Sequence, residues 1–467
     1  MIKRRIDLLF ALLTVTIAAS GCQEYETIKA EMQNPKAGGE GTVFASTSDA
    51  YSLPMKNITA RHRVDFVVGN ALFKENWVPS PSSVESRQGL GPLMNAHSCS
   101  SCHFKDGRGA PPIESGEVPV ALLVRMSLPG KDPQTGGVLP VPNYGDQLQH
   151  KAILGVRAEA SFLVDYEELP GRYADGTLYT LVKPILKFSD HKFGPWPKQT
   201  LLSARIAPPM IGVGLLEAIP ETDILALADA NDRDGDGISG RPNRVWNHRT
   251  QSSELGRFGW KANQPDVHQQ TAGAFAGDMG ITSHTFTKQN CAPEDTECRG
   301  AHATGRAEIT EENLMRVVNY SKNLAVPSRR NLSDRDVLSG AGVFHTIGCA
   351  KCHVSSHVTG VDPDFPENSG QKIFPYTDLL LHDMGEGLAD HRPDFEASGR
   401  EWRTAPLWGI GLTKTVNGHT RFLHDGRARS LEEAILWHGG EATAARTSFV
   451  ELSAQRRAEL IKFLEAI

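Results

Sequence analysis

The C-terminal third of the chain carries a helical pattern of apolar positions. Four of them recur on one helix face: Val337, Leu338, Ala341 and Phe344. Ser333 precedes this run with an acidic residue three positions on, as in a helix N-cap, and Gly348 ends it. A second amphipathic helix is expected from about Ser453. The pattern predicts a helical domain over residues 333–467.

The spacing of apolar residues changes in residues 117–190. The segments VPVALLVRMSL, FLVDYEE and TLYTLVKPILKF alternate or are rich in β-branched and aromatic residues, with turn residues between them. We expect a small β-rich insertion here. The segment GVGLLEAIPETDILALADA that follows is expected to be helical.

The N-terminus reads as an export signal. Lys3, Arg4 and Arg5 precede about twelve apolar residues, too few to span a bilayer, which takes about 20. Ala19-Ser20-Gly21-Cys22 resembles a lipobox, which predicts acylation of Cys22; the alternative is an ordinary cleaved signal. Either reading predicts a periplasmic protein or an outer-membrane-anchored lipoprotein that touches the membrane only through its lipid.

Composition narrows the class of protein. The net charge of −6 and a pI of about 6.3 leave no basic surface for nucleic acid. Hydrophobic residues make up 39% of the chain, below the usual ~45–50%, whereas there are 44 Gly and 28 Pro. These values predict many loops and a core that is filled partly by a group other than side chains.

The chain contains seven cysteines. Apart from Cys22, two of them, Cys291 and Cys298, are seven residues apart in a polar loop and are expected to form a disulfide in an oxidising compartment. The alternative is two free surface thiols. The other four form two Cys-x-x-Cys pairs.

Each pair is followed at once by histidine: Cys99-Ser100-Ser101-Cys102-His103 and Cys349-Ala350-Lys351-Cys352-His353. Cys-x-x-Cys-His is the attachment motif of c-type haem, in which both thiols bond the porphyrin and the histidine ligates iron. A Cys₄ zinc site would not explain the histidines. A thioredoxin-like dithiol would need a βαβ context. The motifs therefore predict two haem c groups.

The first helix of a small cytochrome c carries Gly-x-x-x-Phe, which appears as Gly340 to Phe344 and again as Gly69 to Phe73. We therefore expect a mainly α fold with two cytochrome c-like haem domains, the first elaborated by the β-rich insertion and long loops. The expected order is signal peptide and lipobox (1–22), linker (23–60), N-terminal haem domain (61–332) and C-terminal cytochrome c domain (333–467).

An acidic loop lies in the first haem domain. Asp232, Asp234 and Asp236 alternate before Gly237, like the first half of a calcium-binding loop. Asn243 stands where the twelfth-position Glu of an EF-hand would be. Calcium binding and a solvated turn both stay open.

A candidate distal ligand for the second haem lies near the C-terminus. Ser430 and Glu433 form a capping box for a short helix, and His438 is expected on its last turn before Gly439 and Gly440 end it. The alternative is a helix-end histidine stabilised by the helix dipole. His424 lies in the preceding turn.

Motifs in this region point to a known family. Residues 333–467 contain TDLLLH (377–382), RTAPL (403–407), FLHDG (422–426) and LEE (431–433). They resemble the C-terminal haem domain of bacterial di-haem cytochrome c peroxidases and of the related enzyme that matures tryptophan tryptophylquinone. The resemblance implies that His438 is the distal ligand, where the peroxidases have Met and the maturation enzyme Tyr. It also implies that His382 and His424 lie beside this haem.

The whole chain is also similar to exported di-haem oxidoreductases, sometimes labelled thiol oxidoreductases. The shared segments are SCSSCHFKDGRG, PMIGVGLLEAIPE, GDGISGRPN, AGAFAGDMGITS, LLLHDMG and FLHDGRARSLEEAILWHGGEA. Histidine in place of methionine lowers a haem potential. That departure weakens a peroxidase mechanism that stores an electron on a high-potential second haem.

The first haem has no clear distal ligand. Four residues are candidates, each with a packing or surface alternative: Met126, His150, Met210 and Glu217. We expect an open or weakly ligated haem that receives electrons from the second haem and reduces a small-molecule oxidant such as hydrogen peroxide. The expected electron partner is a small cytochrome or cupredoxin.

Two other functions stay open. One is a pure electron carrier with two six-coordinate haems. The other is a protein-modifying maturase that uses Trp408 and Trp437 near the second haem as hopping sites, although both could simply pack.

Overall fold

The computed structural model describes residues 31–301 and 307–467 and has a mixed α/β architecture, with 30% helix and 19% strand. The prediction of a mainly α fold with two cytochrome c domains is therefore wrong. The physical reason is that residues 122–206 pair into long strands rather than a small insertion, and many helices are only one or two turns long.

Eleven helices occur in the described residues: α2 (Ala60–Lys74), α3 (Val213–Glu217), α4 (Glu221–Ala226), α5 (Val267–Met279), α6 (Thr296–Ala301), α7 (Glu311–Lys322), α8 (Arg335–Thr346), α9 (Thr413–Asn417), α10 (Leu431–Leu436), α11 (Thr443–Glu451) and α12 (Ala454–Ala466). The strands are β1 (Leu93–Met94), β2 (Leu122–Lys131), β3 (Val138–Leu139), β4 (Lys151–Ala152), β5 (Ser161–Arg172), β6 (Leu178–Ser189), β7 (Leu201–Ile206), β8 (Arg244–Asn247), β9 (Ser252–Leu255), β10 (His357–Val358), β11 (Lys372–Ile373), β12 (Leu381–Asp383) and β13 (Glu401–Arg403).

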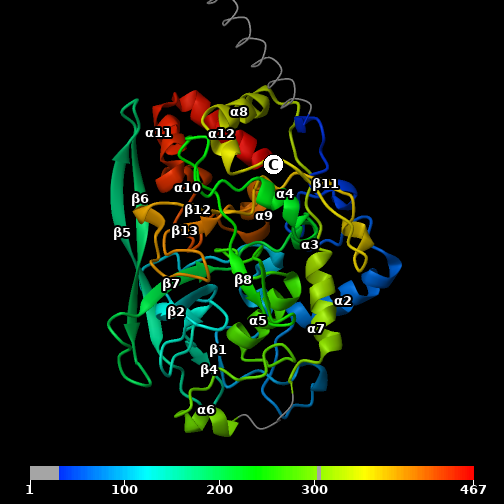
Figure 1. Cartoon of the computed structure of the whole chain (residues 1–467), viewed down its shortest axis with the longest axis vertical. Helices are drawn as coiled ribbons and strands as arrows, with labels where there is room; N and C mark the ends of the chain where they lie inside the picture. The colour runs from blue at the N-terminus through cyan, green and yellow to red at the C-terminus, as the bar shows by residue number, and fades with distance from the viewer. Residues whose placement is uncertain (1–30, 302–306) are drawn as a thin grey trace, which may run out of the picture.

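The strands form several small antiparallel sheets, of which β3-β2-β7 has three strands. The hairpin β5-β6 runs along one side of the molecule, beside α10 and α11 (Figure 1). Its turn is attached to the C-terminal helices, because Tyr173 donates a hydrogen bond to Glu432 (2.8 Å) and Asp175 pairs with Arg457 (2.8 Å). The β-rich segment therefore packs against the C-terminal part of the chain.

Two helix pairs stand beside the two Cys-x-x-Cys-His motifs. Helix α2 packs on α7, and α8 packs on α12. A Cβ at Gly69 would collide with the Arg316 carbonyl, and one at Gly340 would collide with the Glu459 carbonyl. Glycine in both Gly-x-x-x-Phe motifs thus allows close approach of a partner helix.

The capping residues lie close to their predicted positions. Helix α8 has Asp334 as its N-cap, one residue after Ser333, and its carboxylate accepts from Asp336 N–H (2.7 Å). After α8 the chain turns through Gly348, which has a φ of 94°. Ser453 is the N-cap of α12.

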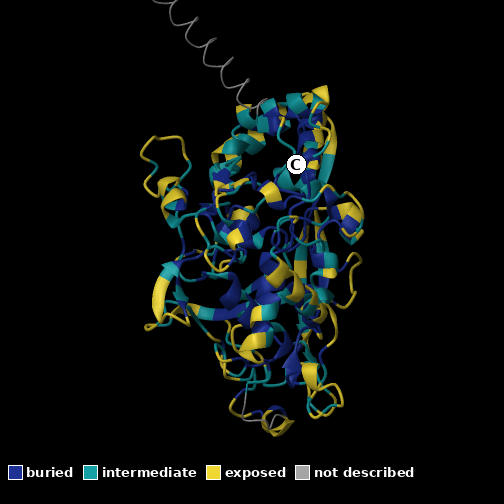
Figure 2. Ribbon diagram, turned by 90° about the vertical axis from the view of Figure 1, so that its right-hand side faces the viewer, coloured by how far each residue is buried: buried dark blue, intermediate teal, exposed yellow. Residues whose placement is uncertain are grey.

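Most of the apolar core falls into two clusters; buried residues are dark blue in Figure 2. One cluster contains α2, α5 and α7, together with Tyr51 and Met55 from the segment expected to be a linker. The other joins β2, β5 and β7 to α8, α10 and α12. The second cluster therefore crosses the expected boundary at residue 332.

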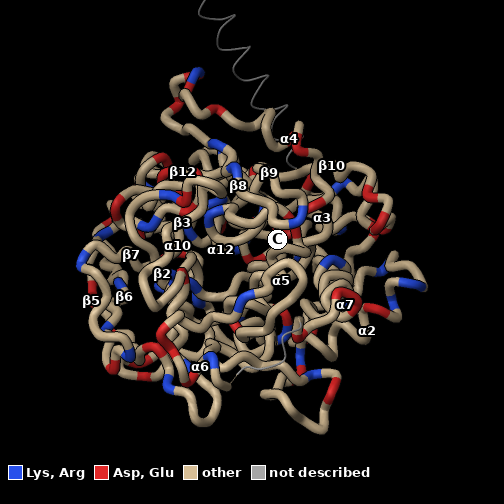
Figure 3. Tube along the Cα trace, turned by 60° about the horizontal axis from the view of Figure 1, so that its bottom comes forward, with Lys and Arg blue, Asp and Glu red and all other residues tan. Residues whose placement is uncertain are grey.

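Acidic and basic residues are interspersed along the trace (Figure 3). Within the part of the chain that the structure describes, no helix combines the length and apolar character needed to cross a membrane.

Candidate functional site

The two Cys-x-x-Cys-His segments adopt the same turn. The backbone N–H of His103 donates to the Cys99 carbonyl (2.9 Å), and that of His353 donates to the Cys349 carbonyl (3.0 Å). All four motif thiols are free, whereas Cys291 and Cys298 are joined by a disulfide. The turn leaves both thiols and the following imidazole of each motif available to one ligand.

The second motif opens into a cavity of about 250 Å³. Both cysteines of this motif, His353 and His438 line it, together with largely apolar side chains such as Phe344 and Leu460. A planar apolar group joined to the two thiols fits such a lining.

The two histidines in this cavity are held in the tautomer that a metal ligand needs. Nδ1 of His353 lies 2.9 Å from the Tyr376 carbonyl, and Nδ1 of His438 lies 2.6 Å from the Ala434 carbonyl. Because a carbonyl can only accept, each Nδ1 carries the proton and each Nε2 keeps its lone pair.

Burial keeps both rings neutral. It lowers the pKa of His353 to about 4 against the opposing hydrogen bond to Tyr376, and the nearby His438 lowers it further. Burial likewise lowers the pKa of His438. Two neutral imidazoles from distant parts of the chain therefore meet at one cavity.

Helix α10 positions His438. The Ser430 hydroxyl accepts from the Glu433 N–H (3.0 Å), as the capping box predicts, but the Glu433 carboxylate accepts from Arg429 N–H rather than from Ser430. The helix ends at Leu436, so His438 lies just beyond the last turn rather than on it. Its N–H donates to the Ile435 carbonyl (3.1 Å), which holds the backbone close to the helix end.

His424 forms part of the wall of the same cavity. Its ring stacks on Trp402 with centroids 3.7 Å apart and planes 12° from parallel. Burial lowers the pKa of His424 to about 4, although Asp425 opposes the shift. His424 is thus a neutral, rigidly held ring beside the cavity, as the sequence motif implied.

His382 also lines the cavity but is held between two carboxylates. Its Nε2 lies 2.8 Å from Asp378, and its Nδ1 lies 2.7 Å from Glu441. Burial alone would lower its pKa, but hydrogen bonds to Asp378, Cys352 and Glu441 raise the pKa to about 12. Both nitrogens carry protons, so His382 is a fixed cation and offers iron no lone pair.

The acidic loop reaches the edge of this cavity. Ligand oxygens of Asp232, Asp234 and Asp236 lie within 4.8 Å of one another. Asp236 pairs with Lys351, inside the second haem motif (2.9 Å). No local motif predicts this contact, because 115 residues separate the two partners.

Comparison with known families agrees with this geometry. Residues 32–467 match the profile of the family described as "Di-haem oxidoreductase, putative peroxidase". The chain belongs to the di-haem oxidoreductase family. No curated protein matches the chain in sequence.

The other candidate haem site of this di-haem oxidoreductase surrounds His103. The ring packs near Phe73 (centroids 6.1 Å apart), and burial lowers the pKa of His103 to about 4 while the carbonyls of Pro208 and Gly107 moderate the shift. Its Nδ1 has no well-formed hydrogen bond among the described residues. The residues fit a haem c held by the turn and by a neutral histidine.

Two of the four distal candidates at this site are explained by packing. Met126 is fully buried in β2, opposite Leu202 of β7. Met210 packs on the core, and its N–H donates to Asp106 in the loop just after His103. Apolar packing therefore accounts for both side chains without a ligand role.

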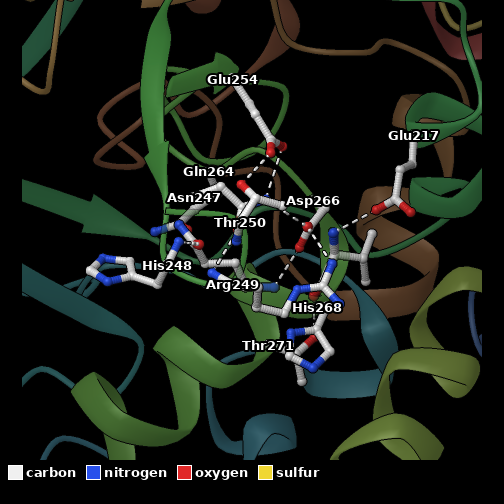
Figure 4. Close-up of polar contacts among 12 residues, drawn as sticks. Glu217, Asn247, His248, Arg249, Thr250, Glu254, Gln264, Asp266, His268 and Thr271 are labelled. Atoms are coloured by element: carbon white, nitrogen blue, oxygen red, sulfur yellow. Dashed lines mark hydrogen bonds and ion pairs between the residues drawn. The ribbon is translucent and has the colours of Figure 1, made fainter. Parts of the chain in front are cut away.

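Glu217 caps a helix instead of facing a haem. Its carboxylate accepts from the Val267 N–H at the start of α5 (2.5 Å) and pairs with Lys322 (2.7 Å). Figure 4 shows Glu217 directed toward this helix start, where Asp266 is the N-cap. The carboxylate is therefore used structurally.

His150 is a residue type that commonly ligates iron, but its tautomer does not suit a ligand. The Asn95 amide nitrogen donates to its Nδ1 (2.7 Å), which leaves the proton of a neutral ring on Nε2. Burial lowers its pKa to about 4, with Lys151 adding to the shift. His150 therefore presents an N–H rather than a lone pair at Nε2.

Sequence reasoning missed three residues that line the second cavity: Arg108, Trp260 and Trp402. Arg108 and Trp260 precede His353 by 245 and 93 positions, and Trp402 follows it by 49. No local motif marks them, so only the fold could reveal them.

Proposed function

We propose that this chain is an exported di-haem c oxidoreductase in which the haem at Cys349 and Cys352 exchanges electrons and the haem at Cys99 and Cys102 reduces hydrogen peroxide. The observation that carries the proposal is the pair His353 and His438, two neutral imidazoles with matched Nδ1–H bonds at one cavity. Two strong axial ligands favour electron transfer over substrate binding.

Haem c supplies one-electron redox chemistry and, where one face is open, a place for a peroxide to bind. The protein residues would do the rest at the second site. His353 and His438 would ligate its iron, while the carbonyls of Tyr376 and Ala434 fix the orientation of the two rings. Trp402 holds the His424 ring in place by stacking on it.

The first site supports an open face. Met126, Met210 and Glu217 are held in packing or capping contacts, and His150 presents an N–H. An N–H donor near an open haem would favour a bound oxygen ligand over direct ligation. Glu217 has no role as an acid or base in this proposal, because α5 and Lys322 occupy its carboxylate.

Low-temperature EPR of the oxidised holoprotein tests this function. We expect one low-spin bis-histidine signal and one high-spin signal. Full reduction should remove both ferric signals, and one equivalent of peroxide, which takes one electron from each haem, should restore them. Two low-spin signals without high-spin iron would favour the pure electron carrier. Trp408 and Trp437 are buried, at 3% and 6% exposure, so they offer no route of their own to a protein substrate at the surface.

Export and its partners belong to the same proposal. The disulfide Cys291–Cys298 is the kind that persists in an oxidising compartment. The predicted signal and Cys22 lie outside the described residues. We propose a periplasmic or outer-membrane location with Cys22 acylated, and a small cytochrome or cupredoxin as redox partner. Radiolabelled palmitate incorporation that survives in Cys22→Ser would contradict acylation at Cys22.

We also propose that the acidic loop binds calcium, since the carboxylates of Asp232, Asp234 and Asp236 gather around one point. Calorimetric titration of the chelator-treated holoprotein should show one site that Asp234→Asn weakens at least tenfold. The exposed Asp364→Asn serves as the control and should bind normally. Equal calcium binding by both variants would exclude this loop.

A further inference from the structure

One buried arginine connects the two haem sites. Arg108 follows His103 by five residues, yet its side chain lines the second cavity. The loop is tied to the C-terminal part of the chain, because Asn417 accepts from Arg108 N–H (3.1 Å) and His419 Nε2 lies 3.1 Å from the Arg108 carbonyl. The first haem loop thus delivers a guanidinium to the second site.

This guanidinium has no counter-ion among the residues that the structure describes. Arg108 is 5% exposed, and its Nε and Nη1 are buried without hydrogen-bond partners. Trp260 and Phe422 lie beside it, with ring centroids 5.7 and 5.5 Å away. Burial lowers the pKa of Arg108 to about 10, so it remains charged at neutral pH.

An unpaired buried charge is costly, and neighbouring arginines avoid it. Arg427 pairs with Asp425 (2.7 Å), and Arg205 pairs with Asp394 (2.8 Å). Arg108 has neither a carboxylate nor a carbonyl partner for its Nε and Nη1, which indicates that an anion outside the polypeptide completes this site.

Several other charged groups of the cavity wall already have partners among the described residues. Asp236 pairs with Lys351, and Glu441 with His382. Arg403 donates to the Gly259 carbonyl (2.9 Å). Arg108 is the cation of this wall whose buried Nε and Nη1 have no partner, and it lies close to the aromatic rings of Trp260 and Phe422.

We propose that Arg108 binds a propionate carboxylate of the haem attached at Cys349 and Cys352. The inference rests on the proposed occupancy of this cavity by haem. The propionates are the carboxylate groups that a haem would bring to it. A guanidinium matches a carboxylate in shape and forms charge-assisted hydrogen bonds with it. The loop that carries the iron ligand of one haem then also carries the counter-ion of the other.

The test is Arg108→Gln in the full-length holoprotein, with the exposed Arg335→Gln as control. Thioether bonds to both cysteines would retain the haem, so loss of the contact would not empty the site. We expect the propionate-bending band in the resonance Raman spectrum to shift toward weaker hydrogen bonding. We also expect a lower midpoint potential for the second haem, because loss of a nearby cation favours the ferric state. Arg335→Gln should leave both unchanged.

Arg108→Lys keeps the positive charge but replaces the planar guanidinium with an ammonium group. It should preserve most of the midpoint potential while the Raman band still shifts, and it provides the test if Arg108→Gln does not accumulate. The second haem is identified as the one whose potential responds to His438→Met.

Three results would overturn the inference: an unchanged propionate band in both Arg108 variants, a lower potential without any band shift, or a response confined to the first haem. A wild-type protein with only one haem, counted by mass spectrometry, would instead refute the proposed function.

Discussion

The redox potential expected of the second haem site depends on His438. Its Nδ1–H is fixed by the Ala434 carbonyl, and the residue lines the same cavity as His353. A nitrogen ligand at both axial positions stabilises ferric iron more than a thioether does. The haem at this site should therefore sit at a lower potential than one with a methionine ligand.

Replacing His438 with methionine should raise the midpoint potential of the second haem, by on the order of 0.1 V within the ~0.8 V range that axial ligands span. His438→Ala should convert that haem to high spin. Redox titration and EPR measure both effects, with the exposed His391→Ala as control. An unchanged low-spin signal in His438→Ala would show that another residue is the ligand.

Asp378 supports a buried charge rather than a ligand. Burial lowers the pKa of His382, but contacts with Asp378, Cys352 and Glu441 outweigh it. The pKa is raised to about 12, above the unfolded value near 6.5. The resulting stabilisation is complete below about pH 6.5 and is lost as pH rises toward 12.

We therefore expect Asp378→Asn to lower the free energy of unfolding by about 3 kcal/mol at pH 6. The loss should be smaller at pH 9.5. Urea unfolding of the holoprotein at both pH values measures this, and Asp364→Asn should have no effect. A penalty that grows with pH would contradict a protonated His382.

At the scale of elements, each helix next to a haem motif depends on a glycine contact. Gly340 of α8 lies against the Glu459 carbonyl of α12, and Gly69 of α2 against the Arg316 carbonyl of α7. Gly342 is on the same helix as Gly340, but nothing lies within 4 Å of the position its Cβ would take. The two positions separate helix propensity from helix packing.

Gly340→Ala should reduce stability by about 1–3 kcal/mol, because α12 must shift to make room. Gly342→Ala should be neutral or stabilise by up to about 1 kcal/mol through its helix propensity. Thermal unfolding of the two variants measures the difference. Equal effects would mean that α8 and α12 are not in close contact at Gly340.

At the scale of the whole molecule, the C-terminal segment does not have a core of its own. Val124 and Phe162 of the β-rich segment share an apolar cluster with Val337 and Phe344. The hairpin β5-β6 adds polar contacts to the same helices (Figure 1). The strands and the C-terminal helices should therefore fold as one unit.

A fragment of residues 333–467 should accordingly fail to form a cooperative structure, even when haem is attached. The full chain should show one calorimetric transition for both parts, since strands and helices share apolar surface. Calorimetry and near-UV circular dichroism of both proteins test this. A fragment that unfolds cooperatively at the wild-type temperature would support the independent C-terminal domain predicted from sequence.

Local chemistry was readable from the sequence alone. The two haem motifs span five residues each, and the Ser430 cap sets the start of α10, so spacing along the chain determines which atoms can meet. The position of His438 follows from the end of that helix, displaced by about one residue.

Only the tertiary structure decided the fold class, the stack of Trp402 on His424 and the placement of Arg108 in the second cavity. Each depends on contacts between segments far apart in sequence, and alternating residues do not specify their partner strands. The sequence determined which groups can bond haem. Long-range packing determined which charges and rings surround it.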